Sequence, residues 1–185
     1  MSKYNLEPVR QEHLEMILKW RNSERIRKSM FSENKISLDE HQEWFKKISA
    51  SDQYAYFIFS MKERPIGLIG FSDIHKHHSH CYWGFYIGEE DAPSGAGTVM
   101  GYLALNHMFE QFDLVKICGE VLLNNQASLH FHQKLGFIQE GHFKKHIRKG
   151  DTYIDVVRYA LFKESWYEVR EHVKNHLREK GIEMT

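Results

Sequence analysis

The chain has 185 residues and a mass of 22.1 kDa, which suits a single domain over residues 1–185. Its composition, 42% hydrophobic and 27% charged, excludes a disordered chain. The 25 Lys and Arg balance the 25 Asp and Glu, so neither nucleic acid nor an acidic membrane is an expected partner. With two cysteines, no signal-peptide pattern and no apolar run near the roughly 20 residues that span a bilayer, we expect a cytoplasmic protein.

Hydrophobic periodicity predicts an α+β order of elements. The chain opens with a strand over 4–9 and a helix over 11–20, and a Ser37–Glu40 capping box starts a second helix over 37–49. Three antiparallel strands follow over 54–61, 66–74 and 81–88. After residue 97 we expect a long central helix, a strand over 115–121, a helix over 124–135, strands over 136–147 and 152–162, and a last helix over 163–180.

A loop of small residues lies between the strand that ends near residue 88 and the central helix. The start of a helix leaves unpaired N–H groups with partial positive charge, and small side chains let an anion approach them. A flexible turn ahead of a core helix would have the same composition, and no P-loop Gly-Lys-Ser/Thr follows. The candidate anion cradle is Ser94, Gly95, Ala96, Gly97 and Thr98.

A second motif lies downstream, where Asn125, Ser128 and His132 share one helical face. Together with the small-residue loop, the run Asn-x-x-Ser-x-x-x-His-x-Lys-Leu-Gly-Phe resembles the GCN5-related N-acetyltransferase (GNAT) superfamily over nearly the whole chain. The resemblance implies a mixed, mostly antiparallel sheet of about seven strands flanked by helices. It also implies a splayed strand pair that holds acetyl-CoA.

The same resemblance implies which residues contact the cofactor. The pantetheine arm would pair with the backbone of Phe85, Tyr86 and Ile87, and Asn125 and Ser128 would lie beside it. The pyrophosphate would bind the loop in the pattern Gln/Arg-x-x-Gly-x-Gly/Ala, which falls on residues 92–97. Ala92 departs from this pattern, which removes a side-chain donor but leaves the backbone amides.

Two residues are candidates for proton transfer. His132 stands where the superfamily usually has a tyrosine that protonates the departing thiolate; packing beside Phe131 is the alternative. Glu120, in the strand before the Asn125 helix, is the candidate general base for the attacking amine; a solvated carboxylate at a strand edge is the alternative.

The family resemblance implies that the N-terminal part builds the pocket for the acceptor amine. The run KWRNSERIRK has five basic residues and one acidic residue, and aromatic residues follow it, which suits a nucleotide or a solvated helix face. Trp-Arg-Asn, Met-Phe and Trp-Gly-Phe-Tyr-Ile-Gly are similar to the branch of UDP-4-amino-4,6-dideoxy-N-acetyl-β-L-altrosamine N-acetyltransferases of pseudaminic acid biosynthesis. That likeness implies a nucleotide-sugar amine substrate bound near Arg21, Met30, Phe31 and His41.

Three other interpretations stay open. A polyamine acetyltransferase would need an acidic pocket, which Glu33, Asp39, Glu40 and Glu43 could supply; a ribosomal-protein N-terminal acetyltransferase shares the cofactor half. A non-catalytic acyl-CoA-binding module would keep the cradle and lose the chemistry. The HKHHSH run lacks a metal-ligand pattern, so no metal is expected. The 148–151 turn and the last helix would either form a homodimer contact or cap the pocket.

Overall fold

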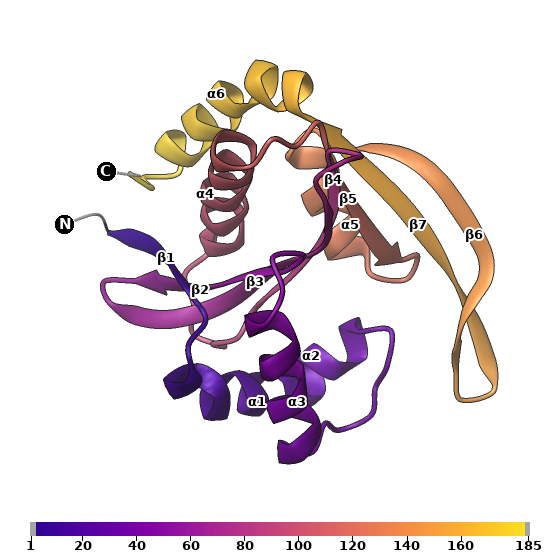
Figure 1. Cartoon of the computed structure of the whole chain (residues 1–185). Helices are drawn as coiled ribbons and strands as arrows, with labels where there is room; N and C mark the ends of the chain where they lie inside the picture. Colours follow the sequence, from indigo (N-terminus) through magenta and orange to yellow (C-terminus); the bar gives the residue numbers. More distant parts are fainter. Residues whose placement is uncertain (1–2, 184–185) are drawn as a thin grey trace.

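The computed structural model describes residues 3–183, and within them seven strands form one sheet in the order β1-β2-β3-β4-β5-β7-β6 (Figure 1). The strands are β1 (Tyr4–Pro8), β2 (Ala55–Met61), β3 (Arg64–His75), β4 (His80–Ile87), β5 (Lys116–Leu122), β6 (Ile138–Lys149) and β7 (Thr152–Phe162). Neighbouring strands are antiparallel except β4 and β5, which are parallel. The predicted α+β class and seven strands are confirmed.

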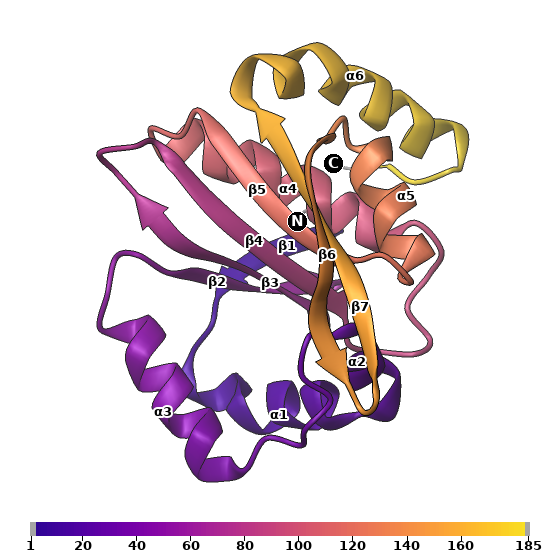
Figure 2. The same ribbon diagram turned by 90° about the vertical axis from the view of Figure 1, so that its right-hand side faces the viewer.

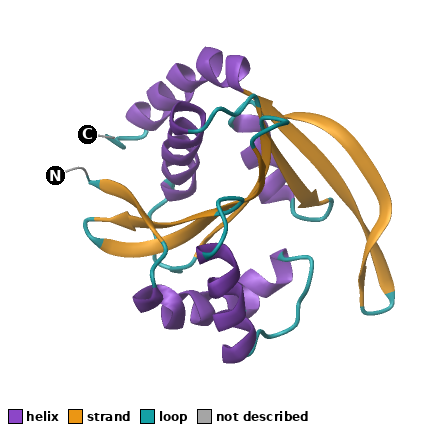
Figure 3. Ribbon diagram, in the orientation of Figure 1, coloured by secondary structure: helices purple, strands orange, loops and turns teal. Residues whose placement is uncertain are grey.

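Helices cover both faces of this sheet (Figure 3). They are η1 (Gln11–His13), α1 (Leu14–Asn22), α2 (Glu24–Ser29), α3 (Leu38–Ser49), α4 (Ala96–Gln111), α5 (Gln126–Lys134) and α6 (Lys163–Glu179). In Figure 1, α1, α2 and α3 lie below β1–β3 while α4 and α6 lie above. No helix within residues 3–183 is both long and apolar enough to cross a membrane.

Alternation along β2 divides the core between the two faces. Phe57 and Phe59 join the larger buried cluster, which includes α4, whereas Ile58 joins a smaller cluster with Ile17 and Trp20 of α1. Successive side chains of a strand point to opposite faces, so one strand supplies both clusters. The smaller cluster anchors α1 and α2 against the sheet.

The strands β4 and β5 separate after a short paired stretch. His80–Tyr82 pair with Lys116–Cys118, and no pairing between the two strands is found among the described residues beyond Tyr82. The remaining parts of both strands therefore diverge, because neither supplies hydrogen bonds to the other. The splayed pair expected from the family resemblance is confirmed.

The N-terminal helices differ from the prediction. The expected helix over 11–20 is a 3-10 turn followed by α1, and α2 was not predicted. Ser23 has an extended backbone that ends α1, and its Oγ accepts a 3.4 Å hydrogen bond from the Ile26 amide to cap α2. Ile26 is the one buried residue of α2, so the hydrophobic pattern was too short to reveal the helix. The Ser37–Glu40 capping box is confirmed.

Candidate active site

A cleft of about 1260 Å³ opens where β4 and β5 diverge. Its walls come from α1, α2, the segment between α2 and α3, α3, the strands β2 to β5 and β7, and the starts of α4 and α5. It brings together candidate residues that are more than 90 positions apart in the sequence. Those on its lining are Arg21, Met30, Phe31, His41, Phe85, Tyr86, Ile87, Gly97, Glu120, Asn125, Ser128 and His132.

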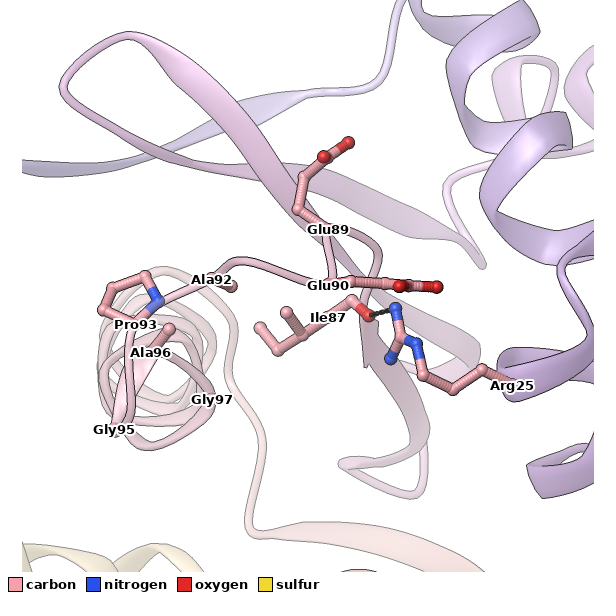
Figure 4. Close-up of a pocket in the computed structure, with 9 residues that line it drawn as sticks. All are labelled: Arg25, Ile87, Glu89, Glu90, Ala92, Pro93, Gly95, Ala96 and Gly97. Carbon is pink, nitrogen blue, oxygen red and sulfur yellow. Dashed lines mark hydrogen bonds between the residues drawn. The ribbon is translucent and has the colours of Figure 1, made fainter.

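A smaller cavity of about 510 Å³ adjoins the start of α4 (Figure 4). Gly95 is the residue before the helix and has φ +89°, a backbone conformation that favours glycine. A Cβ there would also lie 2.4 Å from Ile182 Cδ1, so this position requires glycine for two reasons. The N–H groups of Gly97 and Thr98 at the helix start find no acceptor among the described residues. Gly97 lines both cavities, so its unpaired amide lies at the junction between them.

Two of the five cradle residues do not line either cavity. Ser94 is exposed, and the Thr98 side chain is buried, where its Oγ1 accepts a 3.3 Å hydrogen bond from Lys134 Nζ. Gly95, Ala96 and Gly97 do line the smaller cavity. The cradle is therefore a backbone feature, to which the two hydroxyl side chains do not contribute.

The start of α5 forms another part of the cleft wall. Asn125 caps this helix, and its Oδ1 accepts a 3.1 Å hydrogen bond from the Ser128 amide. The side-chain Nδ2 of Asn125 has no hydrogen-bond acceptor in residues 3–183. It therefore keeps two donors for a ligand in the cleft.

His132 is buried, with 2% of its surface exposed. Its Nδ1 donates to the Ser128 carbonyl at 2.8 Å, and its Nε2 accepts from Trp83 Nε1 at 3.0 Å. Burial lowers the pKa of His132 to about 4, so the ring is neutral near pH 7. A neutral ring with both nitrogens in use has no proton to spare for a thiolate. These contacts place His132 in the cleft wall, and its role as the acid stays a prediction.

Gly119 of β5 explains how this aromatic pair fits between the splayed strands. A Cβ at Gly119 would lie 2.6 Å from His132 Nε2 and 2.7 Å from Trp83 Nε1. Such distances are shorter than side chains can accommodate, so the pair depends on glycine at this position. The sequence offered no signal for this contact, because it joins β4, β5 and α5.

Glu120 lines the cleft, but its carboxylate already has a cationic partner. Its Oε1 accepts a 2.9 Å hydrogen bond from Arg158 Nε and a second one from Arg158 Nη2. Arg158 Nη1 also donates to the Tyr82 hydroxyl at 2.9 Å. Arg158 therefore holds the Glu120 carboxylate in a fixed place in the cleft wall. Arg158 was missed because the register that places it opposite Glu120 appears only in the folded sheet.

Two buried polar atoms in the cleft lack partners. Arg21 Nη2 donates to the Ser32 carbonyl at 3.2 Å, but Arg21 Nη1 is buried without a hydrogen bond to any described residue. The Tyr86 hydroxyl is also buried without a hydrogen bond to any described residue. Burial lowers the pKa of the Arg21 guanidinium and raises the pKa of Tyr86, and the two groups interact electrostatically. Buried donors without acceptors are costly, which makes this part of the cleft a place for a polar ligand group.

The other predicted acceptor residues have different surroundings. His41 is 3% exposed, its Nε2 donates to the Leu14 carbonyl at 2.9 Å, and its ring stacks on Trp44 at 5.0 Å. These contacts give His41 a packing role in the wall, in place of the expected substrate contact. Met30 packs against the smaller core cluster, and Phe31 is 38% exposed.

The acidic residues considered for a polyamine site are mostly engaged. Glu40 is the one of these four that lines the cleft, and its carboxylate accepts from Ser37 in the capping box. Glu33 pairs with Lys149 at 2.9 Å. A carboxylate that the sequence analysis missed is Asp73, which lines the cleft and forms no ion pair or hydrogen bond with residues 3–183. Its φ of +48° marks the bulge of β3 where it lies.

The β6–β7 hairpin reaches the helices on the far side of the cleft. In Figure 2 its tip lies beside α2. Lys149 Nζ donates to Glu33 Oε1 and to the Lys28 carbonyl, both at 2.9 Å. These contacts attach the hairpin to α2 and to the segment that follows it, and both the cap and the homodimer contact stay predictions.

No group of three or more metal-ligating side chains that could hold an ion is found within the described part of the chain. The rings of His75, His77, His78 and His80 cluster at the β3–β4 turn, with the His75 and His80 centroids 5.0 Å apart. These rings contact one another at the surface, away from the cleft lining.

Comparisons with known proteins agree with this geometry. The family model described as acetyltransferase (GNAT) domain matches residues 3–138. Spermidine N(1)-acetyltransferase of Vibrio cholerae is 24% identical over 166 residues, covering 89% of this chain and 96% of that relative. Acetyltransferase PseH of Campylobacter jejuni is 26% identical over 133 residues, covering 72% and 82%.

A solved structure has the same fold. It is the spermidine N-acetyltransferase of V. cholerae in complex with CoA and spermine, with a TM-score of 0.84 at 23% identity, covering 89% of this chain and 98% of that one. The family model spans well over half of the sequence. The chain therefore belongs to the GNAT acetyltransferase family and is an acetyl-CoA-dependent N-acetyltransferase.

Proposed function

We propose that this enzyme transfers the acetyl group of acetyl-CoA directly to the 4-amino group of a UDP-linked amino-dideoxy sugar of the pseudaminic acid pathway. The observation that carries the proposal is the pair of unpartnered buried donors, Arg21 Nη1 and the Tyr86 hydroxyl, in the cleft. Phosphate oxygens accept hydrogen bonds from a guanidinium strongly. An anionic nucleotide would therefore satisfy both groups, whereas a polycation, which has no acceptor, would leave Arg21 Nη1 unpaired.

The donor substrate would occupy the other half of the cleft. The free amides at Gly97 and Thr98 suit its pyrophosphate, and the unpaired edge of β4 at Phe85–Ile87 suits the amides of its pantetheine arm. The Asn125 amide group would contact the same arm. These placements carry the predicted cofactor residues forward as proposals.

The transfer forms a bond from the amine nitrogen to the acetyl carbon and breaks the carbon–sulfur bond of the thioester. The amine must lose a proton, and the sulfur leaves as a thiolate that takes one from solvent. We propose that Glu120 receives the amine proton through Oε2, which accepts no hydrogen bond from residues 3–183. Arg158 would hold that carboxylate in place.

Spermidine is the second candidate acceptor. It is favoured by the names of the V. cholerae relative and of the solved structure, and by the unpaired Asp73 carboxylate in the cleft. The two acceptors make opposite electrostatic demands on the same wall. A nucleotide needs the positive charge of Arg21, whereas a polyamine is repelled by it and attracted by Asp73.

The test is release of CoA thiol from acetyl-CoA with three acceptors: the UDP-4-amino sugar, spermidine and an N-terminal alanine peptide. If the sugar is the substrate, Arg21→Gln is expected to raise its KM about tenfold or more and to leave the KM of acetyl-CoA unchanged. The matched control is Lys19→Gln, which removes an exposed charge from the same helix. If spermidine is the substrate, Arg21→Gln will lower its KM and Asp73→Asn will raise it.

Two results would overturn the proposal. Turnover with spermidine or the peptide, and none with the sugar, would move the assignment to that acceptor class. Absence of turnover with all three, while CoA still raises Tm, would point to the non-catalytic acyl-CoA-binding module.

A further inference from the structure

Arg25 lies at the junction of the two cavities and lines both of them. It extends from α2 toward the end of β4, opposite the start of α4 (Figure 4). Its Nη2 donates to the Ile87 carbonyl at 3.1 Å and to the Gly88 carbonyl at 2.8 Å. These bonds hold the guanidinium at the cavity and leave Nη1 and Nε without an acceptor among the described residues.

The smaller cavity has no other cationic side chain on its lining. Ala92, at the position where the family pattern has Gln or Arg, offers only a methyl group and packs against the larger core cluster. Glu89 of the preceding loop is bound by Trp20 Nε1 at 2.8 Å and by Arg64 at 3.0 Å, so its charge is largely compensated. Glu90 also lines the cavity, and Figure 4 draws it among the lining residues.

We propose that Arg25 supplies the side-chain donor that Ala92 lacks, and that it binds the pyrophosphate of acetyl-CoA together with the start of α4. A guanidinium presents several N–H groups in a plane, which matches phosphate oxygens, and Nη1 and Nε are free for this. The backbone amides of Gly97 and Thr98 would bind from the opposite side. The inference rests on the acetyl-CoA half of the proposed function and is independent of the acceptor.

The experiment measures the Kd of CoA by calorimetry for the wild-type chain, for Arg25→Gln and for Arg25→Gln combined with Ala92→Arg. We expect Arg25→Gln to weaken CoA binding about tenfold or more, and the added Ala92→Arg to restore most of the loss. The matched control is Lys28→Gln, which removes an exposed charge from the same helix and should leave the Kd unchanged.

A second ligand separates phosphate binding from support of β4. S-Acetylpantetheine lacks the pyrophosphate, so Arg25→Gln should leave its affinity, measured by competition, within about twofold. Equal weakening of both ligands, or no rescue by Ala92→Arg, would show that Arg25 only positions the Ile87 and Gly88 carbonyls. An unchanged Kd for CoA in Arg25→Gln would overturn the inference alone. Failure of the wild-type chain to bind CoA would overturn the acetyl-CoA half of the proposed function as well.

Discussion

Replacing His132 by glutamine removes a titrating group from the core and keeps an acceptor for the Trp83 N–H. The pKa of His132 falls from an ordinary value near 6.5 to about 4 on folding, because the ring is buried. The folded state therefore binds fewer protons than the unfolded state between these values. The contribution of His132 to the free energy of unfolding is therefore fully present above pH 6.5, and it is lost as the pH falls toward 4. The linkage relation gives a loss of about 2 kcal/mol between pH 7.5 and pH 5.

The assay is urea unfolding of the wild-type chain and of His132→Gln at both pH values. His41 and His107, whose pKa values burial also lowers, are present in both proteins, so their contributions cancel in the difference. On acidification from pH 7.5 to pH 5, the free energy of unfolding of the wild-type chain should fall by about 2 kcal/mol more than that of the variant. An equal loss of unfolding free energy in the two proteins would refute the inference that the folded state holds His132 as a buried, neutral ring.

The activity of the same variant tests the mechanism separately. We expect the kcat of His132→Gln at pH 8 to stay within about tenfold of the wild-type value, since a neutral His132 donates no proton to the thiolate. A loss of 100-fold or more, with unchanged Kd for CoA, would restore the acid role predicted from sequence.

Four further substitutions follow from the structure. Gly97→Ala should raise or maintain Tm, because its Cβ would meet the nearest atoms at an ordinary 3.8 Å, yet raise the KM of acetyl-CoA about tenfold by narrowing the approach to the α4 amides. Gly119→Ala should lower the unfolding free energy by about 1–3 kcal/mol in urea titrations, since its methyl would lie 2.6 Å from a buried ring nitrogen. Lys149→Gln should raise the acceptor KM a few fold and spare that of acetyl-CoA, and an equal effect on both would contradict a cap over the acceptor side. Glu120→Gln should lower kcat and move the pH optimum upward, because the amine then depends on bulk deprotonation; an unaltered pH–rate profile would argue against its role as base.

The order of strands and helices could be predicted because each depends on a local pattern. The β7 bounds, 152–162, match the predicted strand, and the capping box at Ser37 begins α3 as expected. The short helix α2 was missed because its single buried residue, Ile26, gives no periodicity. Local patterns therefore predicted the elements whose apolar face is long enough to repeat.

The chemistry of the site was harder to predict, because it depends on contacts between distant elements. His132 was chosen for its residue type and spacing, but burial lowers its pKa and Trp83 from β4 donates a hydrogen bond to its Nε2. Glu120 was chosen for its place on β5, but its carboxylate is held by Arg158 from β7. Residue type identified the groups near the cleft, while the tertiary partners determine what each can do.

The charged run of α1 and α2 joins both halves of the site. Ser23 ends one helix and starts the next, so that Arg21 lines the larger cleft and Arg25 lines both the cleft and the cavity at α4. Arg27 lines neither cavity and donates to the backbone carbonyls of Asn22 and Glu33. Because the two proposals assign one cation of this helix pair to each substrate, Arg21→Gln and Arg25→Gln serve as controls for one another. The first should affect the acceptor alone and the second acetyl-CoA alone, and a shared effect of either variant would mean that the two cations act as one charged surface.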